Sequence, residues 1–356
     1  MTRSVLITGG AGFIGANLAV RLKEWHPEWH ITALDNLRRR GSELNLPRLG
    51  AAGVTFVHGD VRAADDLPSD PVDAIIECAA EPSVLAGHGG ESPRYVIEAN
   101  LGGLIHCLEL ARARGADLIF LSTSRVYPVA ALNSLRVCEE PTRFVLEAEQ
   151  PLPGASACGV AETFPLEGAR SLYGASKLCG ELLISEYATA YGLRAVINRC
   201  GVIAGPWQMG KVDQGVFALW MAAHVFNRPL AYLGWGGTGK QVRDLLHVED
   251  LCELVDRQLT ETERFAGQTL NVGGGTANSL SLQETTRLCQ QITGRRIAVG
   301  SCPENRPADV RLYQSDCRRL EQLCGWRPTR TPEQVLADLH AWMVAHYDLL
   351  RPVFGG

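Results

Sequence analysis

Short apolar runs alternate with longer stretches of helical period through the first half of the chain. The runs are rich in β-branched residues and are separated by polar or glycine-containing turns. They cover Ser4–Thr8, His30–Leu34, Val54–Val57, Val72–Ile76 and Leu118–Leu121, and a further run covers Leu193–Asn198 after a helical stretch over Ser171–Tyr191. This rhythm is typical of βαβ units. It predicts an α/β fold with a doubly wound parallel sheet that is covered by helices on both faces.

The pattern changes after residue 205. Turns rich in glycine and proline at 205–206, 234–239 and 273–275 separate shorter elements. Helical periodicity returns at Ser281–Ile292 and Pro332–His346, and a short helix over Asp316–Cys324 is ended by Gly325. We expect residues 1–205 to form the sheet domain and residues 206–356 to form mainly a smaller C-terminal substrate-binding lobe, with some segments free to return to the sheet.

The first apolar run leads directly into a glycine-rich turn. Gly9, Gly12 and Gly15 are spaced by three residues, and a helix is predicted to open at Phe13. Glycines let the backbone turn tightly and approach a pyrophosphate, which then lies at the positive end of the helix. A strand, this turn and a helix together predict a Rossmann-type dinucleotide site.

Asp35 ends the second run, twenty residues after Gly15. A carboxylate there accepts hydrogen bonds from both adenosine ribose hydroxyls and repels a 2′-phosphate, which favours NAD over NADP. Residues 38–40 are all arginine and are able to neutralise such a phosphate, so NADP remains the alternative. Further along, Asp60 and Val61 are placed to border the adenine, although Asp60 also suits a solvated turn.

Ala79 and Ala80 follow the fourth run and leave room for a dinucleotide, or they simply fill the core. Tyr173 and Lys177 are four residues apart and therefore lie on one face of a helix. An ammonium and a positive nicotinamide ring both favour the phenolate, which makes the tyrosine a usable base. Thr123, at the end of the fifth run, supplies a hydroxyl to the same substrate oxygen or caps a turn.

Composition excludes several other classes. The net charge of −5 gives no global attraction to nucleic acid or to anionic membranes. The eleven cysteines form no Cys-x-x-Cys pair, so we assign no metal and expect a reducing, cytoplasmic setting. Met1 is followed at once by a strand-like run without the features of a secretory signal, and the apolar stretch 216–226 is too short to span a bilayer.

The glycine fingerprint, Thr123 and the Tyr-x-x-x-Lys pair, in this order, resemble the extended short-chain dehydrogenase/reductase family of nucleotide-sugar epimerases and dehydratases. The later segments 239–250, 271–274 and 306–309 resemble that family as well. The resemblance implies Thr123, Tyr173 and Lys177 as catalytic residues. It implies that NAD contacts Gly9, Gly12, Phe13, Ile14, Gly15, Asp35, Asn36, Asp60, Val61, Ala79, Ala80, Asn100, Tyr173 and Lys177.

Within the family, segments 34–37, 56–60, 239–244 and 278–282 resemble the subfamily of CDP-paratose 2-epimerases, also called CDP-tyvelose epimerases. That likeness implies a nucleotide-sugar substrate bordered by Gln208, Met209, Gln214, Arg243 and Arg306, and a place in lipopolysaccharide synthesis. Arginine suits diphosphate because its guanidinium binds two oxygens at once. Many relatives have histidine where this chain has Glu77, and the insert over residues 129–170 shapes the pocket, so the sugar stays open.

The reaction implied is epimerisation through a transient keto sugar, at C2 for the CDP-sugar subfamily. A C4 epimerase, or another oxidoreductase acting on a UDP-, GDP- or dTDP-sugar, is the alternative. Relatives that dehydrate carry an Asp-Glu pair after the catalytic hydroxyl, whereas Ser124 and Arg125 stand here. A simple dehydrogenase and a non-catalytic NAD-binding protein are further alternatives. Family members commonly dimerise through four helices, which implies a homodimer formed by Leu104–Arg114 and Leu178–Tyr191.

Overall fold

The structure, a computed structural model, describes residues 2–87, 90, 92–210 and 214–354 and divides the chain into two compact units. Unit 1 contains the chain up to Val126, Ser171–Arg199 and Leu251–Leu270. Unit 2 contains Tyr127–Arg170, Cys200–Asp250 and the chain from Asn271 onward. Residues 251–270 make most of their contacts within the first unit, and residues 127–170 make most of theirs within the second. The assignment of 1–205 to the cofactor and 206–356 to the substrate stays a prediction.

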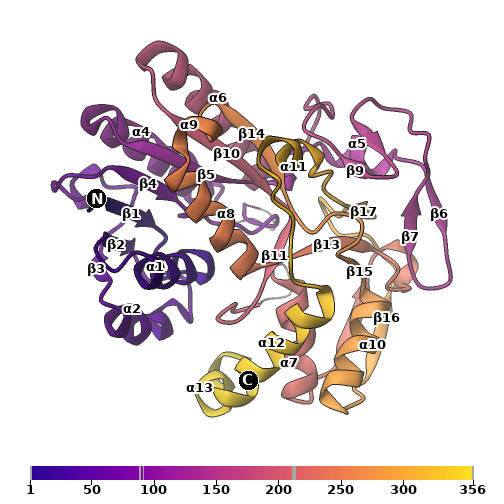
Figure 1. Cartoon of the computed structure of the whole chain (residues 1–356). Coiled ribbons are helices and arrows are strands. Elements are labelled where there is room, and N and C mark those ends of the chain that lie inside the picture. Colours follow the sequence, from indigo (N-terminus) through magenta and orange to yellow (C-terminus); the bar gives the residue numbers. More distant parts are fainter. Residues whose placement is uncertain (1, 88–89, 91, 211–213, 355–356) are drawn as a thin grey trace. The chain divides into compact units, whose positions relative to one another are not determined.

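Within the described residues, the centre of unit 1 is a seven-stranded sheet with the order β14-β10-β5-β4-β1-β2-β3 (Figure 1). The strands are β1 (Ser4–Thr8), β2 (His30–Asp35), β3 (Thr55–His58), β4 (Ala74–Glu77), β5 (Asp117–Thr123), β10 (Ala195–Cys200) and β14 (Gln268–Val272). The pairs β1–β2, β2–β3, β1–β4 and β4–β5 are parallel. The predicted fold class is confirmed, and the expected strands are present with ends displaced by one or two residues.

Helices cover the sheet because its strands are apolar on both faces. The helices of this part of the chain are α1 (Phe13–Trp25), α2 (Leu46–Ala52), α3 (Arg94–Ile97), α4 (Gly103–Arg114), α6 (Leu172–Tyr191), α8 (Val248–Thr260) and α9 (Thr262–Phe265). Ile75 and Phe120 point to one face and pack with Leu108 of α4 and Ile184 of α6. Their strand neighbours point to the opposite face, so each strand reads as a continuous apolar run.

The strand order places the candidate residues at one edge of the sheet. β1 lies between β2 and β4, which is where the direction of strand succession reverses. Parallel strands collect their carboxyl ends at one edge, and ligands of doubly wound sheets bind outside that edge at the reversal point. β1, β2, β4 and β5 end there at Thr8, Asp35, Glu77 and Thr123.

Unit 2 is built from smaller sheets and a group of helices. β11 (Val202–Ala204) and β17 (Leu312–Tyr313) pair in parallel with β13 (Val242–His247), which pairs antiparallel with β15 (Ser279–Ser281). Other strand pairs are β12 (Leu230–Leu233) with β16 (Val299–Cys302), β6 (Val137–Glu139) with β7 (Phe144–Leu146), and β8 (Ala155–Ser156) with β9 (Gly159–Val160). The helices are α5 (Val129–Asn133), α7 (Val216–Val225), α10 (Leu282–Thr293), α11 (Arg318–Cys324), α12 (Pro332–Ala345) and α13 (Tyr347–Phe354).

Local sequence signals explain where the longer helices of unit 2 begin. Ser281 with Glu284 and Thr331 with Gln334 form capping boxes at the starts of α10 and α12. These two helices pack against α7, which carries the apolar stretch seen in the sequence. In the described part of the chain, none of the helices has the length and apolar character needed to cross a membrane.

Candidate active site

The turn after β1 is packed so closely that it requires glycine. A Cβ on Gly9 would lie 2.9 Å from the Cα of Ala79, and Gly9 has a φ of +63°. A Cβ on Gly10 would lie 2.6 Å from that of Ala33, and one on Gly15 would lie 2.3 Å from the carbonyl oxygen of Gly9. The backbone therefore turns here in a way that other residues would block.

Helix α1 starts from this turn with its amino end suited to an anion. Gly12 is the N-cap and offers no side-chain acceptor, and the first turn contains no acidic residue. The first N–H groups of a helix lack intrahelical acceptors and carry partial positive charge. Phe13, Ile14 and Gly15 supply these groups, so the site fits the pyrophosphate of a dinucleotide.

Asp35 closes the other side of the turn. Its carboxylate accepts hydrogen bonds from the backbone N–H of Ala11 at 3.1 Å and of Leu37 at 2.8 Å. Burial raises the pKa of Asp35, and these backbone hydrogen bonds partly oppose the rise. The carboxylate is thus fixed at the end of β2, where the ribose of NAD is expected.

Asn36 and Asp60 form a second polar group beside it. The Asn36 amide donates to Asp60 Oδ2 at 2.9 Å, and the Arg62 guanidinium donates to the same carboxylate at 2.7 Å. The hydrogen bond from Arg62 lowers the pKa of Asp60 to about 2. Arg38 lies over the Tyr95 ring, 3.9 Å from its centroid. Asp60 is therefore a charged, pre-oriented carboxylate, and its contact with adenine stays a prediction.

The side chain of Asn100 is hydrogen-bonded to the segment that follows β4. The Asn100 side chain accepts from Glu81 N at 2.7 Å and donates to Glu81 O at 3.2 Å and to Ser176 Oγ at 3.0 Å. The Asn100 side chain is fully buried and connects the segment just after Ala79 and Ala80 to α6. Val61, also buried, accepts a hydrogen bond from His106 through its carbonyl. A direct contact of these residues with NAD stays a prediction.

The catalytic candidates lie at the end of β5 and in the first turns of α6. Ser171 caps the helix by accepting from Gly174 N at 3.2 Å. A Cβ on Gly174 would lie 2.1 Å from the carbonyl oxygen of Arg125, so the glycine lets α6 approach the backbone two residues after Thr123. The helix carries half-buried Tyr173 in its first turn, and Thr123 is buried at the end of β5.

One turn along α6, Lys177 is buried in an ion pair that the sequence interpretation did not predict. Its Nζ donates to Oε2 of Glu77 at 2.9 Å, and both side chains are at most 2% exposed. Burial alone would lower the pKa of Lys177, but the Glu77 carboxylate and Tyr173 raise it above its usual value. Burial raises the pKa of Glu77, and the Lys177 ammonium opposes the rise.

The substrate candidates all belong to unit 2. The Gln208 amide donates to Ile203 O at 2.9 Å, while its buried Oε1 has no hydrogen-bond partner among the residues that the structure describes. Arg243 donates to the carbonyl of Val310 at 2.6 Å and lies 3.5 Å from Asp309 Oδ1. The other three are buried Met209 and half-buried Gln214 and Arg306.

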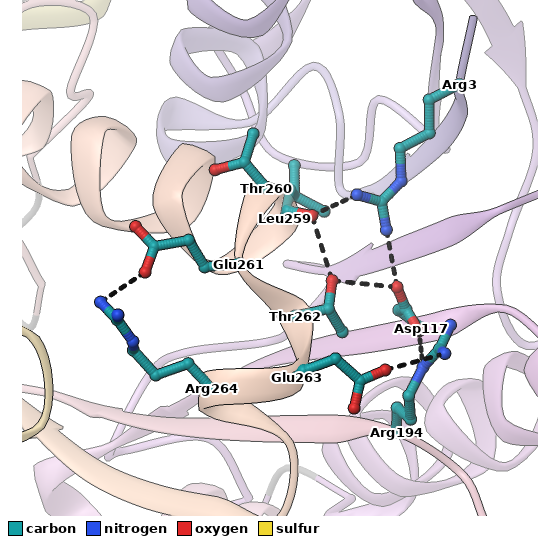
Figure 2. A pocket seen from close by; sticks show the side chains of 9 residues that line it. All are labelled: Arg3, Asp117, Arg194, Leu259, Thr260, Glu261, Thr262, Glu263 and Arg264. Carbon is teal, nitrogen blue, oxygen red and sulfur yellow. Dashed lines mark hydrogen bonds and ion pairs between the residues drawn. The ribbon is translucent and has the colours of Figure 1, made fainter. Parts of the chain in front are cut away.

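A pocket of about 580 Å³ lies at the opposite, amino-terminal edge of the sheet (Figure 2). Figure 2 shows Arg3 and Arg194 both paired with Asp117, at 2.6 and 2.7 Å, and Arg264 paired with Glu261. The charged groups of this pocket neutralise one another. Because doubly wound sheets bind ligands at the carboxyl edge, we interpret it as a surface ion-pair network.

Comparisons with known proteins agree with this geometry. Residues 5–273 match the model of the NAD dependent epimerase/dehydratase family. The chain belongs to this family. It is 29% identical to the CDP-paratose 2-epimerase of Salmonella typhi over 95% of this chain and 98% of that protein. It is 30% identical to a dTDP-glucose 4,6-dehydratase of Mycolicibacterium smegmatis over 98% of this chain and 96% of the relative.

A solved structure shows the same fold. The UDP-glucose 4-epimerase of Thermus thermophilus, solved in complex with NAD, superposes with a TM-score of 0.74 and 27% identity over 96% of this chain and 99% of its own. The family resemblance predicted from the sequence is confirmed, and the protein is an NAD-dependent enzyme. The glycine turn, the amino end of α1 and Asp35 are the residues of this chain that fit the cofactor.

Proposed function

We propose that the protein is an epimerase of a nucleoside-diphosphate sugar, and that its substrate is a CDP-hexose inverted at C2. The observation that supports the proposal is the close approach of Gly174, on the helix that carries Tyr173 and Lys177, to the backbone of Arg125, two residues after Thr123. Likeness to a CDP-paratose 2-epimerase along nearly the whole chain supports the choice of substrate.

Each catalytic residue has one task. Tyr173, as phenolate, takes the proton of the reacting sugar hydroxyl, and Lys177 supplies the positive charge that favours the phenolate. Thr123 donates a hydrogen bond to the same sugar oxygen. NAD, when bound, accepts the hydride and returns it. Inversion follows when the keto sugar presents its other face before the hydride returns, so no NADH accumulates.

Cofactor and substrate are held by different sets of residues. NAD is held by the glycine turn and first turn of α1 (Gly9, Gly12, Phe13, Ile14, Gly15), by Asp35, Asn36, Asp60 and Val61, by Ala79, Ala80 and Asn100, and by Tyr173 and Lys177. The sugar nucleotide is held by Gln208, Met209, Gln214, Arg243 and Arg306. The unpartnered Oε1 of Gln208 supports this role, because a buried acceptor needs a donor such as a sugar hydroxyl.

A 4,6-dehydratase is the competing function, because a dehydratase is 30% identical to this chain. Elimination of water needs a further acid and base, whereas Ser124 and Arg125 follow Thr123. A C4 epimerase acting on a UDP-, GDP- or dTDP-sugar would use the same three catalytic residues. Product analysis separates all three functions.

The test is proton NMR of the NAD-loaded enzyme with CDP-, UDP-, GDP- and dTDP-hexoses in separate samples. Inversion at C2 of a CDP-hexose without NADH release supports the proposal, and loss of a water molecule would establish dehydration. Tyr173→Phe should slow turnover by about 10²–10⁴-fold. No reaction with any of the sugars, or full activity in Tyr173→Phe, would overturn the proposal.

We also propose that the enzyme is a homodimer in the cytoplasm. The large apolar side chains of Ile97, Ile105 and Leu182 are 43%, 39% and 62% exposed on α3, α4 and α6. Cytoplasmic location is supported by the free cysteines throughout the described chain. Use of the product in lipopolysaccharide synthesis depends on the CDP-hexose assignment.

Light scattering after gel filtration tests the oligomer. Leu182→Glu should give monomers, because a charge cannot be buried unpaired at an apolar interface. Val344→Glu, at a position 55% exposed on α12, is the matched control and should leave the dimer intact. A monomeric wild-type protein would contradict the proposal.

A further inference from the structure

Glu77 occupies an unusual position for a carboxylate. It ends β4 within the sheet edge that carries the catalytic residues, and only one of its oxygens is used, by Lys177 at 2.9 Å. Its other oxygen, Oε1, is buried and accepts no hydrogen bond from the described part of the chain. The Lys177 ammonium also lies over the Phe120 ring, 4.4 Å from its centroid.

Stability does not explain this pair. Moving two charges out of water costs several kcal/mol per ion, and the mutual attraction repays that cost only when the remaining lone pairs are satisfied. The unpartnered Oε1 shows that they are not. A buried, incompletely satisfied carboxylate beside a functional lysine therefore points to a role in the chemistry.

The titratable groups around the pair can be named from each element packed against it. Cys78 follows Glu77 just after the end of β4, Cys107 faces the pair from α4, and Tyr173 faces Lys177 from the previous turn of α6. The pKa of Cys107 is raised mainly by burial and, to a smaller extent, by the negative charge of Glu77. The charge of Glu77 therefore acts on neighbouring titratable groups.

One further buried carboxylate lies on α6. Glu181 is bound by Arg199 at 2.7 Å and accepts a hydrogen bond from Ser122. Its charge is therefore already neutralised by a guanidinium, whereas the charge of Glu77 acts on the catalytic lysine.

We propose that Glu77 is a positioning residue for catalysis: it holds Nζ of Lys177 and makes the Tyr173–Lys177 pair keep its proton to higher pH. The proposal rests on the catalytic roles proposed above for these two residues. The physical reason is charge. The buried cluster consists of Glu77, Tyr173 and Lys177. With Glu77 ionised, loss of a proton from the Tyr173–Lys177 pair leaves this cluster with a net negative charge. Without the Glu77 carboxylate, the same loss changes the cluster from positive to neutral, which is more favourable.

The test compares Glu77→Gln with wild type in two measurements on the NAD-loaded enzyme. One is the pH dependence of kcat/KM, whose acid limb reports deprotonation of the base. The other is ultraviolet titration of the Tyr173 phenolate, with Tyr173→Phe subtracted as background. The titration needs no substrate, so it decides the role of Glu77 even if the proposed sugar is wrong.

Glu181→Gln is the matched control, because it removes a carboxylate from a similarly buried ion pair in the same unit. Glu77→Asp keeps the charge and should keep the acid limb near its wild-type position. Glu77→Met, which removes the charge and keeps an unbranched side chain, is the second neutral variant in case the glutamine variant does not fold.

We expect the acid limb and the phenolate titration of Glu77→Gln to move to lower pH by about one unit or more, as for a charge 4–6 Å away. Glu181→Gln should lower stability but leave both curves in place. Unchanged curves in the neutral Glu77 variants, a shift to higher pH, or an equal shift in Glu181→Gln would overturn the proposal.

Discussion

Asp35 and Ala11 are joined across the carboxyl edge of the sheet: Oδ2 of the aspartate accepts a hydrogen bond from the Ala11 amide at 3.1 Å. The bond connects the end of β2 to the glycine turn after β1. The residue that we propose to select the ribose therefore also orders the loop that we propose to receive the pyrophosphate, so one substitution should affect both.

Asp35→Ala should weaken NAD binding about tenfold or more and should reduce the preference for NAD over NADP. The lost hydrogen bonds to a charged acceptor are each worth about 1.5–3 kcal/mol, and repulsion of a 2′-phosphate disappears with the carboxylate. Titration calorimetry with both cofactors measures this. Asp65→Asn, an exposed carboxylate of the same unit, is the control and should change neither affinity. Unaltered NAD affinity in Asp35→Ala would show that the ribose lies elsewhere.

Gly15→Ala should destabilise the protein by about 2 kcal/mol or more and abolish NAD binding at ordinary concentrations. The new Cβ would lie 2.3 Å from the Gly9 carbonyl oxygen, so the turn must open. Gly50→Ala, in helix α2, is the matched control, since nothing lies within 4 Å of its added Cβ. It should gain about 0.5–1 kcal/mol. Urea unfolding and cofactor titration give both quantities, and a stable, NAD-binding Gly15→Ala would contradict the packing argument.

The periodicity of the sequence predicted the sheet of unit 1 well because its strands are buried on both faces. Such strands appear as continuous apolar runs whatever surrounds them, as at Val5–Ile7 and Ile75–Ile76. The glycine turn could also be predicted from the sequence, because the backbone is packed so closely there that glycine is required. Tyr173 and Lys177 needed only the helical repeat to be placed on one face.

The sequence pattern gave no comparable indication of which residues far apart in the chain contact one another. Glu77 and Lys177 are a hundred positions apart, and nothing local to either residue predicts a bond between them. The one chemical hint in the sequence is that a carboxylate ends the buried apolar strand β4. The hydrogen bonds of the Asn100 amide to Glu81 and Ser176 likewise join distant positions, and its contact with NAD stays a prediction. The division into units was unpredictable for the same reason, since residues 251–270 join the sheet only through distant contacts.

Ser171→Ala should lower the free energy of unfolding by about 1 kcal/mol. Its hydroxyl accepts from Gly174 N and is the N-cap of α6, the helix that carries Tyr173 and Lys177. Ser185→Ala makes the same chemical change at an exposed interior position of that helix, where alanine is slightly favoured. Urea unfolding of the two variants should give opposite signs. Equal stabilities would show that the cap contributes nothing.

Asp60 should make stability depend on pH in the acid range. Its pKa is lowered to about 2 by the hydrogen bond from Arg62, so the folded state binds the proton less tightly than the unfolded chain. The stabilisation is therefore fully present above the unfolded pKa of about 4 and is lost as the pH falls toward 2. Because the Arg62 side chain is 37% exposed, solvent screening limits the contribution to about 1 kcal/mol.

Urea unfolding of wild type and Asp60→Asn at a series of pH values from neutral to acid tests this dependence. The variant should be less stable by about 1 kcal/mol at neutral pH, and the difference should shrink steadily as the carboxylate of the wild type is protonated. Asp65→Asn, at an exposed aspartate nearby, should remain parallel to wild type throughout. A difference between Asp60→Asn and wild type that stays constant with pH would show that the lost contact is not a charged one.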